Sequence, residues 1–106
     1  MIISTTESIS GYTIEEHLGT VIGNTIRARH VGKDIMAGFR TIIGGEIKEY
    51  TGMMAESREQ SMMRMKEKAE ELGANAVVGV RFQTSMILSG TAELLVYGTA
   101  VKLSRS

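Results

Sequence analysis

The clearest hydrophobic pattern in the chain predicts a helix over residues 46–72. This segment has one glycine, Gly52, and otherwise consists mainly of strong helix formers. With a rotation of about 100° per residue about the helix axis, one narrow stripe of the helix surface contains Tyr50, Met54, Ser57, Ser61, Met65 and Leu72. Gly73 follows, where a residue with positive φ ends many helices. We therefore expect a long helix that packs this stripe on a core.

Two strands are predicted after the helix, with a turn between them. Residues 76–88 and 91–103 are strand-like, and Ser89-Gly90 is typical of a hairpin turn. In the first run, the alternation of side chains along a strand predicts that one face carries Val78, Val80, Phe82 and Met86. In the second run, one side carries Leu94, Val96 and Ala100, and the other carries Leu95, Tyr97, Val101 and Leu103. Because a strand with two apolar faces is buried on both, we expect the helix to cover one face and a second element the other.

The N-terminal half has a weaker pattern. Residues 14–31 predict one or two strands with a bend, because apolar positions there are separated by polar residues and glycines. Residues 33–43 predict a short helix, which Gly44-Gly45 separates from the long one. The order of strands, short helix, long helix, strand and strand indicates an α+β layer of sheet and helix, in a single domain of residues 1–106.

Element size favours self-association. A helix over residues 46–72 would be about 40 Å long at 1.5 Å per residue, more than a small sheet in one subunit covers. Open strand edges and a second apolar sheet face also favour contacts with neighbours. We therefore expect a homo-oligomer. The alternative is a monomer whose N-terminal segment folds across the second face.

Composition and charge limit the classes of partner. Lys and Arg number 12, as do Asp and Glu, so no net charge draws the chain to nucleic acid or an anionic membrane. No apolar run approaches the roughly 18 residues of a membrane span, and the first residues do not resemble a signal peptide. The absence of cysteine excludes thiolate ligands and fits a cytoplasmic protein. We expect a soluble cytoplasmic protein with neither a nucleic-acid nor a membrane partner.

Histidine, carboxylate and methionine side chains supply the candidates for a metal site. Glu15 and His17 would share one face of a strand, and His30 lies near Asp34. Met62 and Met65, one helical turn apart, are the thioethers of the long helix that could converge on a soft ion. Polar surface and core packing are the simpler interpretations, because Met fills irregular cores and no HExxH or CxxC motif occurs. Met63 is expected to face away from the core.

Other side chains could bind a ligand or stabilise the fold. Gly44-Gly45 could cradle an anion at a helix N-terminus, although a hinge is the commoner use of such a pair. Arg40 and Arg58 lie in or beside apolar helical positions, so each could be buried in an ion pair with Asp34 or Glu59. No GxSxG or GxGxxG motif occurs, so no catalytic residue is assigned.

Long runs of the sequence resemble the YbjQ-like family of small bacterial and archaeal proteins. They are TTESISGYTIEEHLGTVIG, DIMAGFRTIIGGEIKEY, SREQSMMRMKEKAEELGANAVVGVRF and YGTAVKL. The resemblance implies a dodecin-like α+β subunit, with a small antiparallel sheet packed on one long helix plus a short helix, assembled into a homopentamer. The family is described as heavy-metal-binding, with no enzymatic activity attached. Its recurring positions fall on Asp34, Arg40, Gly44, Gly45, Tyr50, Arg58, Gly73, Ala74, Asn75, Gly98 and Thr99.

The residues and the resemblance lead to one main hypothesis and two alternatives. The main hypothesis is a non-enzymatic, cytoplasmic homopentamer that binds a metal ion or a small ligand. The first alternative is an enzyme with a site between subunits around Arg40, Tyr50 and Arg58. The second is a dodecin-like carrier of a flat cofactor, which the aromatic content of 5% disfavours because stacking needs aromatic faces.

Overall fold

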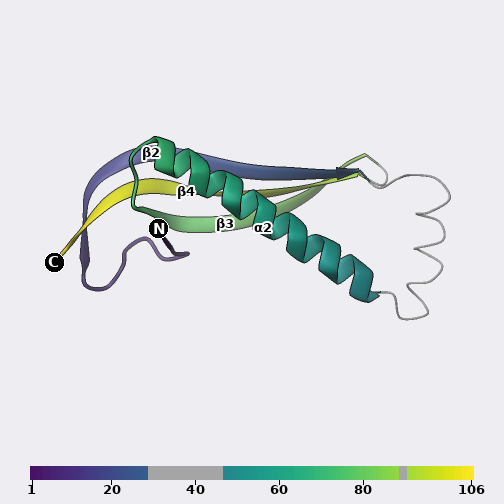
Figure 1. Cartoon of the computed structure of the whole chain (residues 1–106), viewed down its shortest axis with the longest axis horizontal. Helices are drawn as coiled ribbons and strands as arrows, with labels where there is room; N and C mark the ends of the chain where they lie inside the picture. The colour runs from purple at the N-terminus through teal and green to yellow at the C-terminus, as the bar shows by residue number, and fades with distance from the viewer. Residues whose placement is uncertain (29–46, 89–90) are drawn as a thin grey trace.

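Four strands and one helix form the described part of the chain. The computed structural model describes residues 1–28, 47–88 and 91–106, with side chains described for 1–27, 54–86 and 91–106. The elements are β1 (Ile2–Ile3), β2 (Tyr12–Ala28), α2 (Ile47–Glu71), β3 (Ala76–Leu88) and β4 (Thr91–Arg105). The strand order is β1-β3-β4-β2, and α2 crosses the sheet diagonally (Figure 1). This confirms the α+β class.

The sheet is mixed, so the expectation of a purely antiparallel sheet is wrong. β4 pairs antiparallel with both β2 and β3, which confirms the predicted hairpin pairing. β1 instead runs parallel to β3, with Ile2 opposite Ala76. The N-terminal segment extends this contact, because the Ser4 and Thr6 carbonyls accept hydrogen bonds from residues 79 and 80. The predicted short helix at 33–43 and the turn at 89–90 lie outside the described residues.

β2 is one continuous strand with a bend, as one of the two N-terminal alternatives predicted. Its register against β4 shifts between Ile14 and Glu16, and again between His17 and Gly19. Each shift leaves one residue of β2 without an opposite residue, which bends the strand. Figure 1 shows the resulting curve at the end of the sheet nearer the termini. The remainder, from residue 20 to residue 28, pairs in regular register.

Helix α2 ends where the sequence predicts, through a Schellman motif. Gly73 has φ +85°, a conformation that side-chain-bearing residues rarely adopt. Its N–H donates to the Glu70 carbonyl at 2.9 Å, and the N–H of Ala74 donates to the Ala69 carbonyl at 3.0 Å. These bonds satisfy carbonyls that the end of a helix otherwise leaves free.

Helix α2 packs directly on the backbone of β2. A Cβ atom at Gly23 would overlap the Ser61 carbonyl oxygen and lie 2.6 Å from the Met65 nitrogen. Ser57 and Ser61 of the predicted stripe are 1% and 0% exposed, and Met65 is 0% exposed. Small residues on both surfaces therefore permit a close approach between helix and sheet.

Buried hydroxyl groups in this contact are satisfied by hydrogen bonds. The Ser61 hydroxyl lies 2.8 Å from that of Thr25 and donates to the Leu94 carbonyl at 3.1 Å. At the edge of the contact, Arg27 donates to the Ser57 hydroxyl and to the Gln60 side chain, both at 3.0 Å. Satisfied polar pairs of this kind set the position of the helix along the sheet, because a shift would leave buried groups without partners.

Two members of the predicted stripe are not fully buried, since Met54 is half-buried and Leu72 is exposed. Leu72 is 47% exposed, so its predicted place in the core is wrong. It lies after the last residue of α2, immediately before the turn at Gly73, whereas Ala69 one turn earlier is fully buried in the core. Leu72 instead borders a hollow beside β2 that is described below.

A β-bulge changes the faces of β3. Gly79 has φ +62°, and the register against β4 shifts between Val78 and Arg81. Val77 and Val80 consequently both join the core beneath the helix, while Val78 joins the cluster on the other face. The prediction that Val78 and Val80 share a face is therefore wrong, because strict alternation fails at a bulge.

The two predicted faces of β4 are confirmed, and each has its own cluster. Val96 and Ala100 belong to the core beneath α2. Val101 and Leu103 belong to a second cluster on the opposite face, packed against Ile2, Ile9, Tyr12 and Ile14. The N-terminal segment thus covers this face at one end of the sheet, as the monomeric alternative expected. The rest of the face carries Ile22 and Ile26, which are 42% and 55% exposed.

Replacement of Gly23 by alanine tests the backbone contact. Gly23→Ala should lower the free energy of unfolding by about 3 kcal/mol or more, because the added Cβ overlaps backbone atoms of α2 and both backbones would have to shift. Gly73→Ala is the comparison, because its Cβ meets nothing within 4 Å and only its φ is strained. That variant should lose about 1 kcal/mol. Urea denaturation measures both, and equal losses would contradict the account.

Candidate functional site

A hollow of about 480 Å³ lies between α2 and the edge of the sheet at β3. Its lining is Ala55, Arg58, Glu59, Met62, Met63, Lys66 and Phe82. The helical members recur every three or four residues, so they form one flank of α2 beside the buried stripe. Phe82 lies on the helix side of β3, since it is opposite Val96, a residue of the core beneath α2.

The hollow combines soft and charged groups. Met62 is half-buried and Met63 is 58% exposed, so both thioethers are accessible from it. Glu59 lies one turn before them and contributes an exposed carboxylate, while Arg58 and Lys66 contribute positive charge. A floor of thioether and aromatic groups with a charged border can hold a soft cation or a small ligand with an apolar part.

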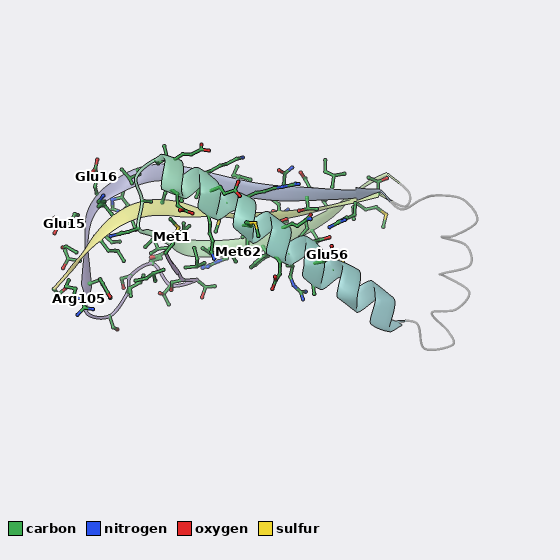
Figure 2. All side chains as sticks on the ribbon, in the orientation of Figure 1. Met1, Glu15, Glu16, Glu56, Met62 and Arg105 are labelled. Carbon is green, nitrogen blue, oxygen red and sulfur yellow. The ribbon has the colours of Figure 1, made fainter. Side chains whose placement is uncertain are left out.

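The predicted pair of thioethers, Met62 and Met65, does not share an accessible site. Met65 is completely buried in the core beneath α2, where it contacts Ala69 and valines of the sheet. Its role is therefore packing. Met62 packs beside this core and also lines the hollow (Figure 2). Met63 faces outward as predicted, and it is the residue that shares the hollow with Met62.

The histidine and carboxylate candidates lie far from this hollow. Glu15 is at the bent end of β2, away from Met62 on the helix (Figure 2). The strand irregularities break the alternation that would have placed Glu15 and His17 on one face, and Glu15 accepts a hydrogen bond from Ser104. Among the described residues, no group of three or more His, Cys, Asp or Glu side chains is placed to hold a metal ion.

Several candidate residues have positions that the structure leaves undescribed. His30, Asp34, Arg40, Gly44 and Gly45 lie outside the described residues. Tyr50 lies in α2, but its side chain is outside the described part.

Arg58 differs from the sequence-based expectation. Its side chain is exposed, so the expectation of a buried ion-pair arginine is wrong. The flank of α2 that carries Arg58 borders the hollow, whereas the sheet contacts the neighbouring stripe that contains Ser57 and Ser61.

Three residues of the recurring sequence pattern have structural roles. Gly73 ends α2 in a left-handed conformation. The side chain of Asn75 donates to the Leu103 carbonyl at 2.9 Å and accepts from the Leu103 N–H at 2.7 Å, so it acts as an additional strand residue beside β4. A Cβ at Gly98 would lie 2.7 Å from the side chain of Val77. These contacts explain the residue types without a ligand.

Phe82 and Met63 are site residues that the sequence pattern did not identify as such. Alternation predicts that Phe82 is in the core, but it is 44% exposed because α2 packs on β2 much more than on β3. The polar neighbours Arg81 and Gln83 were the available signal that this part of β3 is accessible.

Comparisons with known proteins identify the family. A family model described as "Putative heavy-metal-binding" matches residues 1–104. The chain belongs to the YbjQ family. A UPF0145 protein of Thermosipho africanus is 57% identical over 106 residues, or 100% of this chain and 98% of that protein. A UPF0145 protein of Methanosarcina acetivorans is 55% identical over 103 residues, covering 97% of each chain.

One solved structure shows the same fold. It is a crystal structure of a protein of unknown function from Pediococcus pentosaceus, which belongs to the DUF74 family. The TM-score is 0.67 at 19% sequence identity, over 98% of each chain. The α+β arrangement of this YbjQ-family chain therefore also occurs in a distant sequence. None of the helical segments that the structure describes is long and apolar enough to span a membrane.

Truncation of individual methionines should separate packing from surface roles. Met65→Ala should lower the free energy of unfolding by about 2–4 kcal/mol, because it leaves a cavity in the core. Met63→Ala should change it by less than about 0.5 kcal/mol, because the side chain is exposed. Thermal and urea unfolding measure both values. A large loss for Met63→Ala would show that this residue packs against something beyond the single chain.

Proposed function

We propose that this YbjQ-family protein is a non-enzymatic, cytoplasmic homo-oligomer that binds a soft metal ion in the hollow between α2 and β3. The observation that carries the proposal is the pair of accessible thioethers, Met62 and Met63, in that hollow. The family resemblance leads us to expect a pentamer of dodecin-like subunits. The description of the family as heavy-metal-binding agrees with this class of ligand.

The chemistry of the lining favours a soft ion over a hard one. Thioethers bind Cu(I) and similar ions, whereas Mg²⁺ and Ca²⁺ prefer several oxygen ligands. The carboxylate of Glu59 supplies one negative charge within a turn of both sulfur atoms. Because the sequence has no cysteine, thioether sulfur is the soft ligand that this chain offers.

The non-enzymatic part of the proposal follows from the same lining. The residues that border the hollow include no serine, threonine, tyrosine or histidine, so its described lining supplies neither a hydroxyl nucleophile nor an imidazole base. Of the charged groups there, Arg58 and Glu59 are exposed and Lys66 is half-buried. They suit reversible binding better than proton transfer, which benefits from buried groups with altered pKa values.

Self-association is supported by apolar side chains that the single chain leaves uncovered. Ile22, Ile26, Leu72, Phe82 and Met86 are between 42% and 76% exposed. Ile22 and Ile26 lie in β2, Phe82 and Met86 lie in β3, and Leu72 borders a hollow beside β2. Clusters of exposed apolar groups usually mark interaction surfaces.

Titration with Ag(I), a redox-stable mimic of Cu(I), tests the metal proposal. Wild-type protein in chloride-free buffer without thiols should bind Ag(I) at a fixed ratio per subunit, measured by native mass spectrometry and calorimetry. In the double variant Met62→Leu/Met63→Leu, the dissociation constant for Ag(I) should rise about tenfold or more. Each tenfold increase corresponds to a loss of about 1.4 kcal/mol of binding free energy. Leucine keeps the size and apolar character of methionine, so the fold should persist.

Met86→Leu is the matched control. Met86 is 76% exposed but does not line the hollow, so its replacement removes an accessible thioether from another place. This variant should bind Ag(I) as the wild type does. Equal losses in Met86→Leu and in the double variant, or no binding by the wild type, would contradict the proposed site.

A further inference from the structure

Hollows lie on both flanks of α2, and sulfur lines one of them. The hollow of about 480 Å³ between α2 and β3 contains the thioethers of Met62 and Met63. A second hollow, of about 320 Å³, lies on the other flank of the helix beside β2. Its lining carries no sulfur and consists of Thr20, Val21, Ile22, Lys68, Glu71 and Leu72. A soft ion would therefore bind in the first hollow, and the other groups of that lining define what accompanies the ion.

The first hollow is much larger than a metal ion. Its 480 Å³ equal the volume of about sixteen water molecules in the liquid, whereas a bare Ag(I) or Cu(I) ion takes up no more room than about one of them. Sites of about 300–1,000 Å³ usually hold small organic molecules. Phe82 borders the hollow from β3, and an aromatic ring can contact the carbon atoms of such a molecule. The hollow therefore has room for an ion together with a small organic ligand.

The chain supplies this ion with neutral sulfur ligands. Met62 and Met63 are the lining residues that contain sulfur, and a thioether carries no charge. Thiolates are negatively charged and also bind soft ions. Because the sequence has no cysteine, neither this chain nor a second copy of it can supply a thiolate. An ion bound by the thioethers can instead keep a thiolate that came with it.

Positive groups lie on both sides of the thioethers. Lys66 lies one helical turn after Met62 and Met63, and Arg58 lies one turn before Met62. Glu59, one turn before both methionines, is the acid of the lining, so positive groups outnumber negative groups there. Lys66 is also half-buried, which places its positive charge partly out of water. A bare cation would add to this positive charge, whereas a complex that carries negative charge would offset it.

Charged groups outside the hollow alter this balance less. The other described charged side chains of α2 are all exposed, and they are Glu56, Arg64, Glu67, Lys68, Glu70 and Glu71. Glu70 lies one turn after Lys66, but an exposed ion pair of this kind is weak, so Lys66 remains able to bind a ligand. On β3, the Arg81 guanidinium donates to the carbonyls of Thr5 and Val80, at 2.8 and 2.9 Å. The groups that line the hollow therefore decide the charge that it accepts.

We propose that this hollow binds the soft ion together with a small anionic sulfur ligand, namely a thiolate or related sulfur donor that also carries an acidic oxygen group. The ion keeps its bond to the sulfur atom of this ligand. It gains bonds to the thioethers of Met62 and Met63 in place of water, so no bond within the ligand breaks and no electron is transferred. The inference rests on the proposed soft-metal function and names the form in which the metal binds.

Arg58 and Lys66 bind the acidic oxygen group of this ligand. A guanidinium can donate two parallel hydrogen bonds to the oxygen atoms of a carboxylate or a similar group, and an ammonium acts as a point charge. Both side chains extend from the same flank of α2 as Met62, so the ion and the oxygen group of one small ligand can be bound at the same time.

Two soluble complexes of Ag(I) test the charge of the bound form in chloride-free buffer. One equivalent of thiosulfate gives an anionic complex with a sulfur donor and acidic oxygen atoms. One equivalent of thiourea gives a cationic complex with a neutral sulfur donor. Native mass spectrometry should detect wild-type protein that carries Ag(I) and thiosulfate together in equal numbers. Calorimetry measures the dissociation constant of each complex.

The variant Arg58→Gln/Lys66→Gln removes both positive groups and keeps side chains that favour a helix. Its dissociation constant for the silver–thiosulfate complex should rise about tenfold or more. Its dissociation constants for the silver–thiourea complex and for Ag(I) alone should instead fall by about twofold or more, because repulsion of the cation is removed. The single variant Arg58→Gln, at an exposed side chain, should shift each constant in the same direction by a smaller factor.

Arg64→Gln/Lys68→Gln is the matched control. It removes an arginine and a lysine from the other flank of the same helix, where Arg64 donates to the Asn24 carbonyl of β2 and Lys68 lines the second hollow. This variant should bind both silver complexes as the wild type does. Circular dichroism checks that every variant is folded.

Three results would overturn the inference while leaving the metal site in place. They are wild-type protein that binds Ag(I) but releases thiosulfate, an Arg58→Gln/Lys66→Gln variant that binds the silver–thiosulfate complex as the wild type does, and a variant that binds all three forms of silver more weakly by the same factor. Wild-type protein that binds Ag(I) in none of these forms would instead overturn the proposed soft-metal function itself.

Discussion

The contact between the backbones of α2 and β2 at Gly23 is the constraint on which the rest of the structure depends. Ser57 and Ser61 provide the small surface that lets the helix approach, and their hydroxyl bonds to Thr25, Arg27 and Leu94 hold it in one position. Because the helix packs mainly on β2 and β4, residues 81–86 of β3 remain exposed. The position of the helix therefore determines both the core of the chain and the part of β3 that stays exposed.

This asymmetry connects packing with the proposed function. A helix centred over the sheet would bury Phe82 and close the hollow that contains Met62 and Met63. Because α2 instead lies nearer to β2, the flank of the helix that carries thioether and charged groups faces the exposed part of β3. Self-association through residues 82–86 of β3 would enclose that flank, so the proposed metal site and the proposed homo-oligomer depend on the same displacement of the helix.

Local signals were sufficient for β2, α2, β3 and β4, but not for β1 or for all of the faces. The long helix, its end at Gly73 and the two faces of β4 follow from periodicity and from a helix-ending glycine, which act within a few residues. The outward face of Val78 depends on the positive φ of Gly79, and the parallel pairing of β1 depends on a distant strand. The hollow was unpredictable for the same reason, because Phe82 and Met63 come together only after helix and sheet have packed.

Hydrogen–deuterium exchange tests most directly the claim that a complete core leaves edges for neighbouring copies. Amides of the central strand β4, such as those of Val96 and Ala100, should exchange slowly at every protein concentration, because the core belongs to the single chain. Amides of residues 82–86 in β3 should exchange slowly in the assembled protein and rapidly after dilution to monomers. Rapid exchange in residues 82–86 of an intact assembly would contradict the account, as would loss of protection in β4 on dilution.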